Sequence, residues 1–383
     1  WTGQPVGAAT VTPVEQADQW TLQVPIDALA PVWKYAWPNG EQVYFSQVAG
    51  EVVQYTTTGS RLGAYVGAIP HWFYFTPLRS QGPTWSRIVI WSSGIGTFSA
   101  ILGVVIGIWM YSPSKRYRYI GARTAIPYRG QKRWHMILGL VFGIATATWA
   151  FSGMLSMDPF PIATSADESP NDSEFPQALR GAGDYGAFAA RHPREALAAI
   201  PNLPVKELEL TSFAGRPFYL ATLAGGETRI VPVTGEVRTE FDHQDVIDVV
   251  TKAAPPGGLA EIRVLEQYDR YYLDRRRERP LPVVLAALND AGQSRYYIDP
   301  KTGQIVGTYR SSGWVTRWVY HGLHSLDFPW LYNYRPLWDI VVITFMLGGT
   351  ALAVTSLILA WRVLGRKLAR NLPASEDLVP ETD

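Results

Sequence analysis

The sequence predicts an integral membrane bundle of α-helices that also carries water-exposed α+β modules. Two observations support this fold class. Three long runs contain no charged side chain, and outside them short stretches alternate apolar and polar residues around a glycine. Only 17% of the residues are charged, against about 25% in an ordinary soluble domain. The composition therefore indicates a membrane protein rather than a plain soluble enzyme.

The three apolar runs are long enough to cross a bilayer as helices. They lie between Arg87 and Lys115, between Arg133 and Asp158, and between Asp339 and Arg362. Each is longer than the ~20 residues that a helix needs to cross a hydrocarbon core. Each also contains small residues, which let helices approach one another closely in lipid. We predict spans at 86–112, 134–157 and 338–362.

The basic residues set the orientation of these spans. The connection between the first two spans has many Lys and Arg residues and no acidic one, and Arg362, Arg366, Lys367 and Arg370 follow the third. Basic loops stay in the cytoplasm. The basic loop at 113–133 and the tail at 363–383 are therefore expected inside, with 1–85 and 158–337 outside. An outward amino terminus needs an upstream span, so we expect a fourth transmembrane helix before residue 1.

The outer regions contain three similar stretches, each predicted as two strands joined by a tight turn. They run over 43–53, 229–237 and 295–306, with Gly50, Gly235 and Gly303 at the turn position that favours positive φ. Helices are predicted at 184–199 and 243–254, and a linker at 163–176. These patterns predict one small α+β module before the first span and about two between the second and third spans.

Composition excludes several classes of function. The chain has no cysteine, which removes disulfides, iron–sulfur clusters held by thiolates and thiol catalysis. Its 34 Lys and Arg residues are balanced by 33 Asp and Glu residues, so a nucleic-acid partner is not expected. Membrane lipid is the expected surrounding of the three spans. Metal chemistry must then rest largely on the six histidines.

Four of the six histidines lie at the predicted membrane edges. His71, His321 and His324 are expected at the outer edge, and His135 begins the second span at the inner edge. The other two, His192 and His243, lie in polar stretches and are expected to be ordinary surface or capping residues.

Several strings resemble those of a known membrane family. The hairpins ending in Gly-(Glu/Gln)-(Val/Ile)-Val resemble the PepSY module. The strings IPHWFYFTPLR (69–79), RWHMILGL (133–140), FSGMLSM (151–157) and HGLHSLDF (321–328) resemble PepSY-associated transmembrane proteins. Within that family the chain is most similar to inner-membrane siderophore reductases of the ferrioxamine-reductase (FoxB) type. The resemblance implies four spans, PepSY-like modules in the periplasm, and b-type haem that passes electrons to ferric siderophores.

The resemblance also implies that the outer histidines, His71, His321 and His324, ligate haem. An electron-transfer haem favours two strong axial ligands, which His71 and either His321 or His324 could supply. On an α-helix, the spacing of three between His321 and His324 would place both on one face, and the choice between them stays open. A haem at His135 would need its second ligand from the preceding helix. Two haems, one near each face, could then conduct electrons across the membrane.

Other residues near these histidines have more than one interpretation. Arg79, Arg317 and Arg335 could pair with haem propionates or anchor helices at lipid headgroups. Met154 and Met157 are alternative axial ligands or gap-fillers. His71, His321, His324 and Asp327 could instead form a zinc site.

The preferred function is therefore a bacterial inner-membrane, multi-pass oxidoreductase with a large periplasmic portion. It would reduce a ferric siderophore and release its iron. The short cytoplasmic loops carry no nucleotide-binding fingerprint, so the electrons would come from quinol or a separate reductase. The alternative is a non-enzymatic PepSY protein that binds or regulates a partner, with structural histidines. A transporter is disfavoured because no span has a central charged residue.

Overall fold

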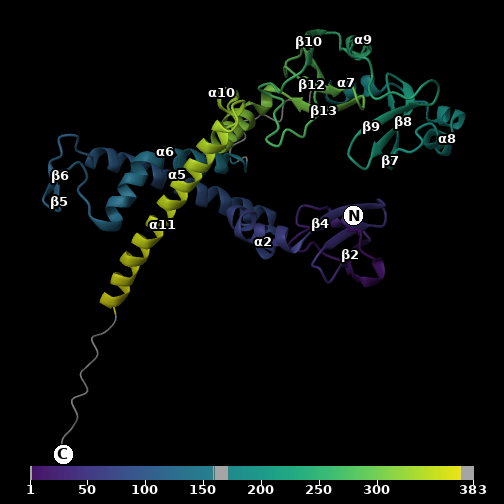
Figure 1. Ribbon diagram of the computed structural model, residues 1–383. Helices are drawn as coiled ribbons and strands as arrows, with labels where there is room; N and C mark the ends of the chain where they lie inside the picture. The colour runs from purple at the N-terminus through teal and green to yellow at the C-terminus, as the bar shows by residue number, and fades with distance from the viewer. Residues whose placement is uncertain (1, 158, 160–170, 372–383) are drawn as a thin grey trace, which may run out of the picture. The chain divides into compact units, whose positions relative to one another are not determined.

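The computed structural model describes residues 2–157, 159 and 171–371, and it divides into two compact units (Figure 1). The first unit comprises Trp1–Pro159 and Leu347–Asp383, and the second comprises Phe160–Met346.

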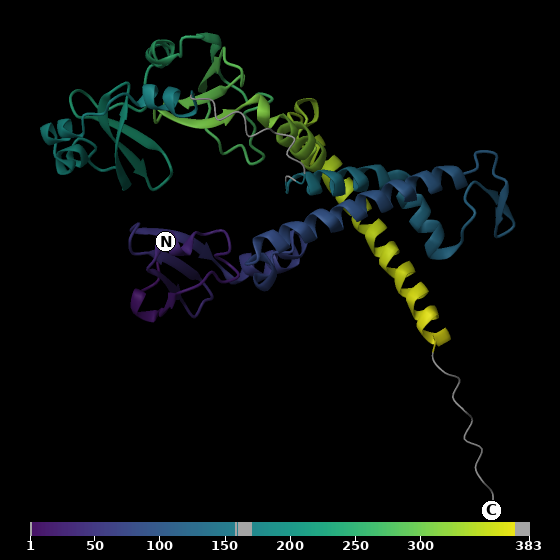
Figure 2. The same ribbon diagram turned by 180° about the vertical axis from the view of Figure 1, so that it is seen from behind.

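Three helices are long and apolar enough to span a membrane, as the sequence predicts. They are α5 (Gly82–Met110), α6 (Gly130–Leu155) and α11 (Leu337–Asn371), and the apolar part of α11 ends at Lys367. Figures 1 and 2 both show α5 and α6 running side by side. A Cβ atom at Gly143 of α6 would lie 2.5 Å from Val104 of α5, so only glycine permits this approach. In the basic loop between them, β5 (Tyr117–Tyr119) pairs with β6 (Ala122–Thr124).

A four-stranded antiparallel sheet precedes α5 in the first unit. Its strands are β1 (Thr10–Val14), β2 (Val32–Ala36), β3 (Gln42–Ser46) and β4 (Glu51–Thr56), paired in chain order. The short helix η1 (Val6–Ala8) precedes β1, and the short helix α1 (Ile26–Leu29) lies between β1 and β2. Ile26, Val32 and Tyr44 form the small buried core. Gly50 turns the predicted hairpin with φ +68°, which confirms that prediction.

Three short helices connect this sheet to α5. They are α2 (Thr58–Val66), α3 (Ala68–Trp72) and α4 (Thr76–Arg79). Thr57 caps α2 by accepting a hydrogen bond from the Ser60 N–H at 3.1 Å. His71 lies near the end of α3.

The second unit contains two further antiparallel sheets. The first has β7 (Val205–Phe213), β8 (Arg216–Leu223) and β9 (Thr228–Pro232), and the second has β10 (Leu259–Leu265), β11 (Val283–Leu288), β12 (Arg295–Asp299) and β13 (Gln304–Tyr309). Side chains of α7 (Asn171–Arg180) and α9 (His243–Ala253) pack with both sheets in one core, which includes Phe175, Val246 and Val284. The two predicted modules of this region therefore share a core.

The second unit also leads into the third long helix through short helical segments. These are η4 (Ser311–Gly313), η5 (Val315–His324) and α10 (Pro329–Tyr332). The segment η5 is a π-helix, which has i→i+5 hydrogen bonds and a wider turn than an α-helix. His321 and His324, three residues apart, are consequently further apart around the axis than the α-helical spacing predicts.

Three local predictions need correction. The stretch 229–237 forms β9, but after Gly235 the chain returns only through an isolated bridge from Ile230 to Arg238. The predicted helix over 184–199 is broken into η3 (Tyr185–Ala190) and α8 (Pro193–Ala198), because Pro193 lacks an N–H and fits only a helix start.

The third correction concerns the predicted linker at 163–176. Residues 171–176 belong to α7, where the buried side chains of Phe175 and Leu179 anchor a helix despite its internal Pro176. Residues 163–170 lie outside the described part of the chain. In contrast, the predicted helix over 243–254 is confirmed as α9, and the hairpin over 295–306 is confirmed as β12 and β13.

Candidate functional site

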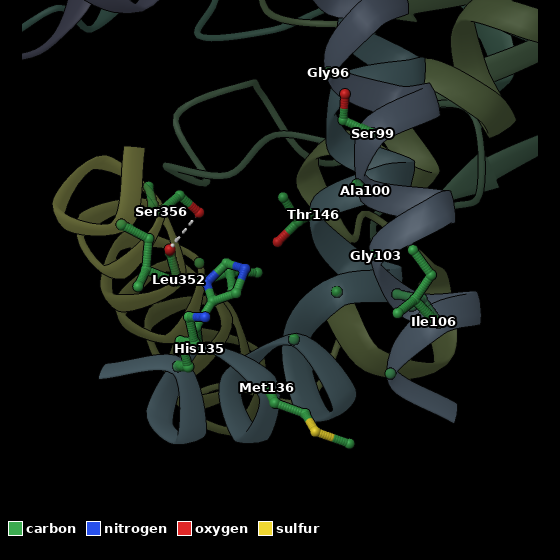
Figure 3. A pocket seen from close by; sticks show the side chains of 18 of the residues that line it. Gly96, Ser99, Ala100, Gly103, Ile106, His135, Met136, Thr146, Leu352 and Ser356 are labelled. Carbon is green, nitrogen blue, oxygen red and sulfur yellow. Dashed lines mark hydrogen bonds between the residues drawn. The ribbon is translucent and has the colours of Figure 1, made fainter. Parts of the chain in front are cut away.

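A cavity of about 780 Å³ lies in the first unit, among α5, α6 and the middle of α11, residues 349–359 (Figure 3). Its walls are mostly apolar and contain many small residues. The polar side chains at its lining include those of His135, Lys132, Tyr128 and Thr146. Figure 3 shows the imidazole of His135 extending from α6 into this space.

Glycines shape the helices around the cavity in two different ways. Gly143 and Gly107 allow close helix contact, since a Cβ at Gly107 would lie 3.2 Å from Leu140. Gly103 faces open space instead, because a Cβ there would meet no atom within 4 Å. The same small residues that suit helix packing in lipid therefore also leave a hollow between the helices.

Hydrogen bonds determine which nitrogen of His135 can act as a ligand. Its Nδ1 lies 3.0 Å from the Thr355 hydroxyl, and that hydroxyl donates its one proton to the Leu352 carbonyl at 2.8 Å. With the hydroxyl proton on the Leu352 carbonyl, the Thr355 oxygen accepts from the imidazole, and this bond pattern matches the tautomer with the proton on Nδ1. We therefore assign the lone pair to Nε2, the nitrogen that a metal would bind.

These features fit a planar cofactor such as haem b. Cofactor sites usually occupy about 300–1,000 Å³ and have mostly apolar walls, as this cavity does. His135 offers an imidazole nitrogen, and the hydrogen bond at its other nitrogen orients the ring. Lys132 and Tyr128 offer polar groups that suit carboxylates. Among the described residues that line the cavity, His135 is the only histidine.

The outer histidines lie on the segments that connect sheets to membrane helices. His71 is exposed on α3, and its ring packs edge-on against Trp72 with centroids 6.1 Å apart. His321 and His324 are half-buried on η5, where Tyr320 contacts both rings at centroid distances of 5.1 and 5.2 Å. His71 belongs to the first unit and the other two to the second. Their joint ligation of a haem stays a prediction.

Charged neighbours surround His321 in the second unit. Burial lowers the pKa of its imidazole, the Asp327 carboxylate opposes this shift, and Arg275 and Arg317 add to it. Burial also raises the pKa of Asp327, although that carboxylate accepts hydrogen bonds from Arg275 at 3.1 and 3.3 Å. At neutral pH the His321 ring is therefore uncharged.

Two of the three predicted propionate-binding arginines already have strong protein partners. Buried Arg317 donates to the backbone carbonyls of Arg270 at 2.5 Å and Asp327 at 2.9 Å. Arg335 pairs with the Asp339 carboxylate. Arg79 stacks over Trp85 at 4.5 Å, and its Nε is buried without a hydrogen-bond partner. Their role toward propionates stays a prediction.

The structure also bears on the sequence interpretations of the zinc site, Met154 and His192. In the described part of the chain, no group of three or more His, Asp or Glu side chains could hold a metal ion. The zinc interpretation joins residues of both units and stays a prediction. A Cβ at Gly94 would lie 3.4 Å from the Met154 sulfur, so Met154 fills space against α5. His192 caps α8 by accepting from the Arg194 N–H at 3.2 Å, as expected.

Sequence reasoning missed Thr355 because its hydrogen bond joins residues far apart in the chain. A hydroxyl inside an apolar span is a weak signal, since Ser and Thr also bond to the carbonyl one turn earlier. Arg275 was likewise hidden in an exposed basic run. Comparison with known proteins adds no name to this site: the chain matches no family model, no curated protein and no solved structure.

Proposed function

We propose that this chain is a haem-b electron-transfer protein of the bacterial inner membrane, which reduces ferric siderophores in the periplasm. The observation that carries the proposal is the cavity beside His135, where Thr355 holds Nδ1 and leaves Nε2 to act as a ligand. The three helices of membrane-spanning length and the family resemblance support the setting.

Each part of the chain has a chemical task in this proposal. Bound haem supplies reversible one-electron exchange. His135 would bind the inner group through Nε2, Thr355 would fix the ring, and the apolar walls would exclude water. His71 and either His321 or His324 would serve a second, outer haem. The external donor would be quinol or a separate reductase.

The substrate would be a ferric chelate with anionic oxygen donors. One electron converts its iron to the ferrous state, which matches hard oxygen ligands less well, and the ferrous ion then leaves the intact chelator. The chain itself forms no covalent intermediate in this scheme.

The decisive experiment measures haem in the full-length protein purified from membranes. We expect a Soret band and a sharp α-band after reduction, and pyridine-haemochrome analysis should give two haems per chain. His135→Ala should lose about one of these two haems, because His135 is the axial ligand proposed for the inner haem. A ferric trihydroxamate should reoxidise the dithionite-reduced protein.

Ser356→Ala is the matched control, since Ser356 lines the same cavity and its hydroxyl bonds to Leu352. It should keep both haems. A colourless full-length protein would support the regulatory alternative. Full haem content in His135→Ala would refute the inner site.

A further inference from the structure

The chain contains one structural unit twice. In the first copy, β1–β4 lead through α2, α3 and α4 into α5, and in the second, β10–β13 lead through η4, η5 and α10 into α11. The sheets share more than their strand order. Lys34 pairs with Tyr44 in the first and Leu285 pairs with Tyr297 in the second, and the register shifts directly after both tyrosines. Gly50 and Gly303 make the next turn with φ +68° and +70°.

The segments between each sheet and its membrane helix carry matching residues at one constant spacing along the chain. The matched pairs are His71 and His324, Phe75 and Phe328, Leu78 and Leu331, Pro83 and Pro336, and Trp85 and Trp338. Tyr44 and Tyr297, and Gly50 and Gly303, follow the same spacing in the sheets. A chance match would not keep one spacing from the sheet to the membrane helix.

The local backbone after each matched histidine is also the same. Phe73 has φ +52° and Leu326 has φ +54°, and each lies two residues after its histidine. Non-glycine residues rarely adopt positive φ, so this agreement is informative. The same backbone turn therefore follows His71 and His324.

An indole fixes that turn to the membrane helix in both copies. Trp85 Nε1 donates to the Trp72 carbonyl at 2.7 Å, and Trp338 Nε1 donates to the Leu326 carbonyl at 3.1 Å. An arginine covers each indole, Arg79 at 4.5 Å and Arg335 at 4.8 Å. The two acceptor carbonyls lie one residue after His71 and two residues after His324, so in each copy the turn after the histidine is tied to its own membrane helix.

His321 has no equivalent in the first copy, where the matching position is Ala68. It lies on the wide π-helical turn and interacts with the charges of Asp327, Arg275 and Arg317. His321 is half-buried beside these charged groups and Tyr320, whereas His71 is exposed and packs against Trp72.

We propose that the haem ligand of the second copy is His324, the structural equivalent of His71, and that His321 is not an axial ligand. The proposal depends on the haem-binding function proposed above. Each copy of the unit then presents one imidazole at the same position. His321 belongs to the polar cluster with Asp327.

The test compares three alanine variants of the full-length haem protein: His71→Ala, His324→Ala and His321→Ala. Haem content, the α-band and the low-spin electron paramagnetic resonance signals are measured for each. We expect His71→Ala and His324→Ala to lose the same low-spin signal. His321→Ala should keep it.

A variant that gains a new spectroscopic band distinguishes a change of haem ligand from misfolding of the protein. His324→Met supplies a thioether at the same position, and it should give the near-infrared band of His–Met ligation while haem is retained. His321→Met should give no such band. If the low-spin signal is lost in His321→Ala and kept in His324→Ala, the ligand assignment is wrong while the haem function stands. If the unmutated protein is colourless, the proposed function fails as well.

Discussion

The two repeated four-stranded sheets have the same topology, but they differ in how far other parts of the chain bury their faces. In the first, β2 has one fully buried residue, Val32, and the remaining positions are only partly buried. In the second, all six residues of β11 are buried. The difference arises because the β7–β9 sheet, α7 and α9 share a core with one face of the β10–β13 sheet.

The sequences of the two central strands reflect this difference. Strand β11 reads Val-Val-Leu-Ala-Ala-Leu, with Val284 in the shared core and Val283 and Leu285 on the opposite face with Tyr297. Strand β2 reads Val-Trp-Lys-Tyr-Ala, and the partly buried aromatic residues Trp33 and Tyr35 occupy the places of Val284 and Ala286. A sheet covered on both faces has continuous apolar strands, whereas the less covered face of the first sheet carries aromatic residues that stay partly exposed. The same fold can therefore serve alone or as part of a larger core.

The largest expected effect comes from a cavity in the doubly covered sheet. Leu285→Ala should lower the free energy of unfolding of the second unit by about 2–5 kcal/mol, because a fully buried leucine leaves a void. Lys34→Ala at the matching position should cost at most about 1 kcal/mol, since it removes only a partly exposed ion pair with Asp18.

Hydrogen exchange of the full-length protein, resolved by peptide, measures both effects. Faster exchange should appear in β10–β13 for Leu285→Ala and should be small in β1–β4 for Lys34→Ala. Equal losses in the two sheets would show that side-chain burial at this matched position does not distinguish them.

A smaller effect is expected from a hydrogen bond that both copies share. Tyr44 donates to the Asp18 carboxylate at 2.6 Å, and Tyr297 donates to Asp269 at 3.1 and 3.2 Å. Each carboxylate also accepts a backbone N–H of its own loop, from Trp20 and Tyr271 respectively. The tyrosine therefore ties the loop before the second strand to the third strand.

Tyr44→Phe and Tyr297→Phe should each cost about 1–3 kcal/mol, since a hydrogen bond to a charged group is lost. The first should cost more because its bond is shorter. Tyr35→Phe, which removes a hydroxyl from a partly buried ring of β2, is the control and should be nearly neutral. Local hydrogen exchange at residues 18–21 and 269–272 provides the measurement. Unchanged exchange in both loops would contradict the role assigned to the tyrosines.

Sequence reasoning succeeded where the signal is local. Charge-free length predicted the three long helices, and Gly50 and Gly303 marked their hairpins. It failed where distant contacts decide the structure. Phe175 draws the predicted linker into α7 through a core shared with Ile298, and the Arg229–Val237 stretch lacks a full returning strand. The ring orientation of His135 depends on Thr355, from another membrane helix.

The smallest expected effect is an opposite response of the two sheets to acid. In the first sheet, burial raises the pKa of Asp18, but hydrogen bonds from Tyr44, Trp20 and Thr21 and the charge of Lys34 outweigh it, so the pKa lies below the ordinary value of 3.8. A carboxyl group whose pKa is lower in the folded than in the unfolded state stabilises the folded protein. This stabilisation is complete above pH 3.8 and is lost as the pH falls through the folded-state pKa.

Asp299, at the end of β12, has the reverse sign. Burial raises its pKa above 3.8, and bonds from Lys301 and Thr302 offset this only in part. The stabilisation by protonated Asp299 is therefore complete below pH 3.8, and it is lost as the pH rises through the raised folded-state pKa. As the pH falls, Asp299 should strengthen the second sheet above pH 3.8, and Asp18 should weaken the first sheet below pH 3.8.

Pulse proteolysis with pepsin as the pH falls can separate the two contributions, because its cleavage sites report which sheet has opened. Asp18→Asn should flatten the acid-induced loss of the β1–β4 sheet. Asp299→Asn should remove the acid-induced gain of the β10–β13 sheet and leave the first sheet unchanged. If both variants change stability with pH in the same direction, burial does not dominate at Asp299, and the two copies handle their charges alike.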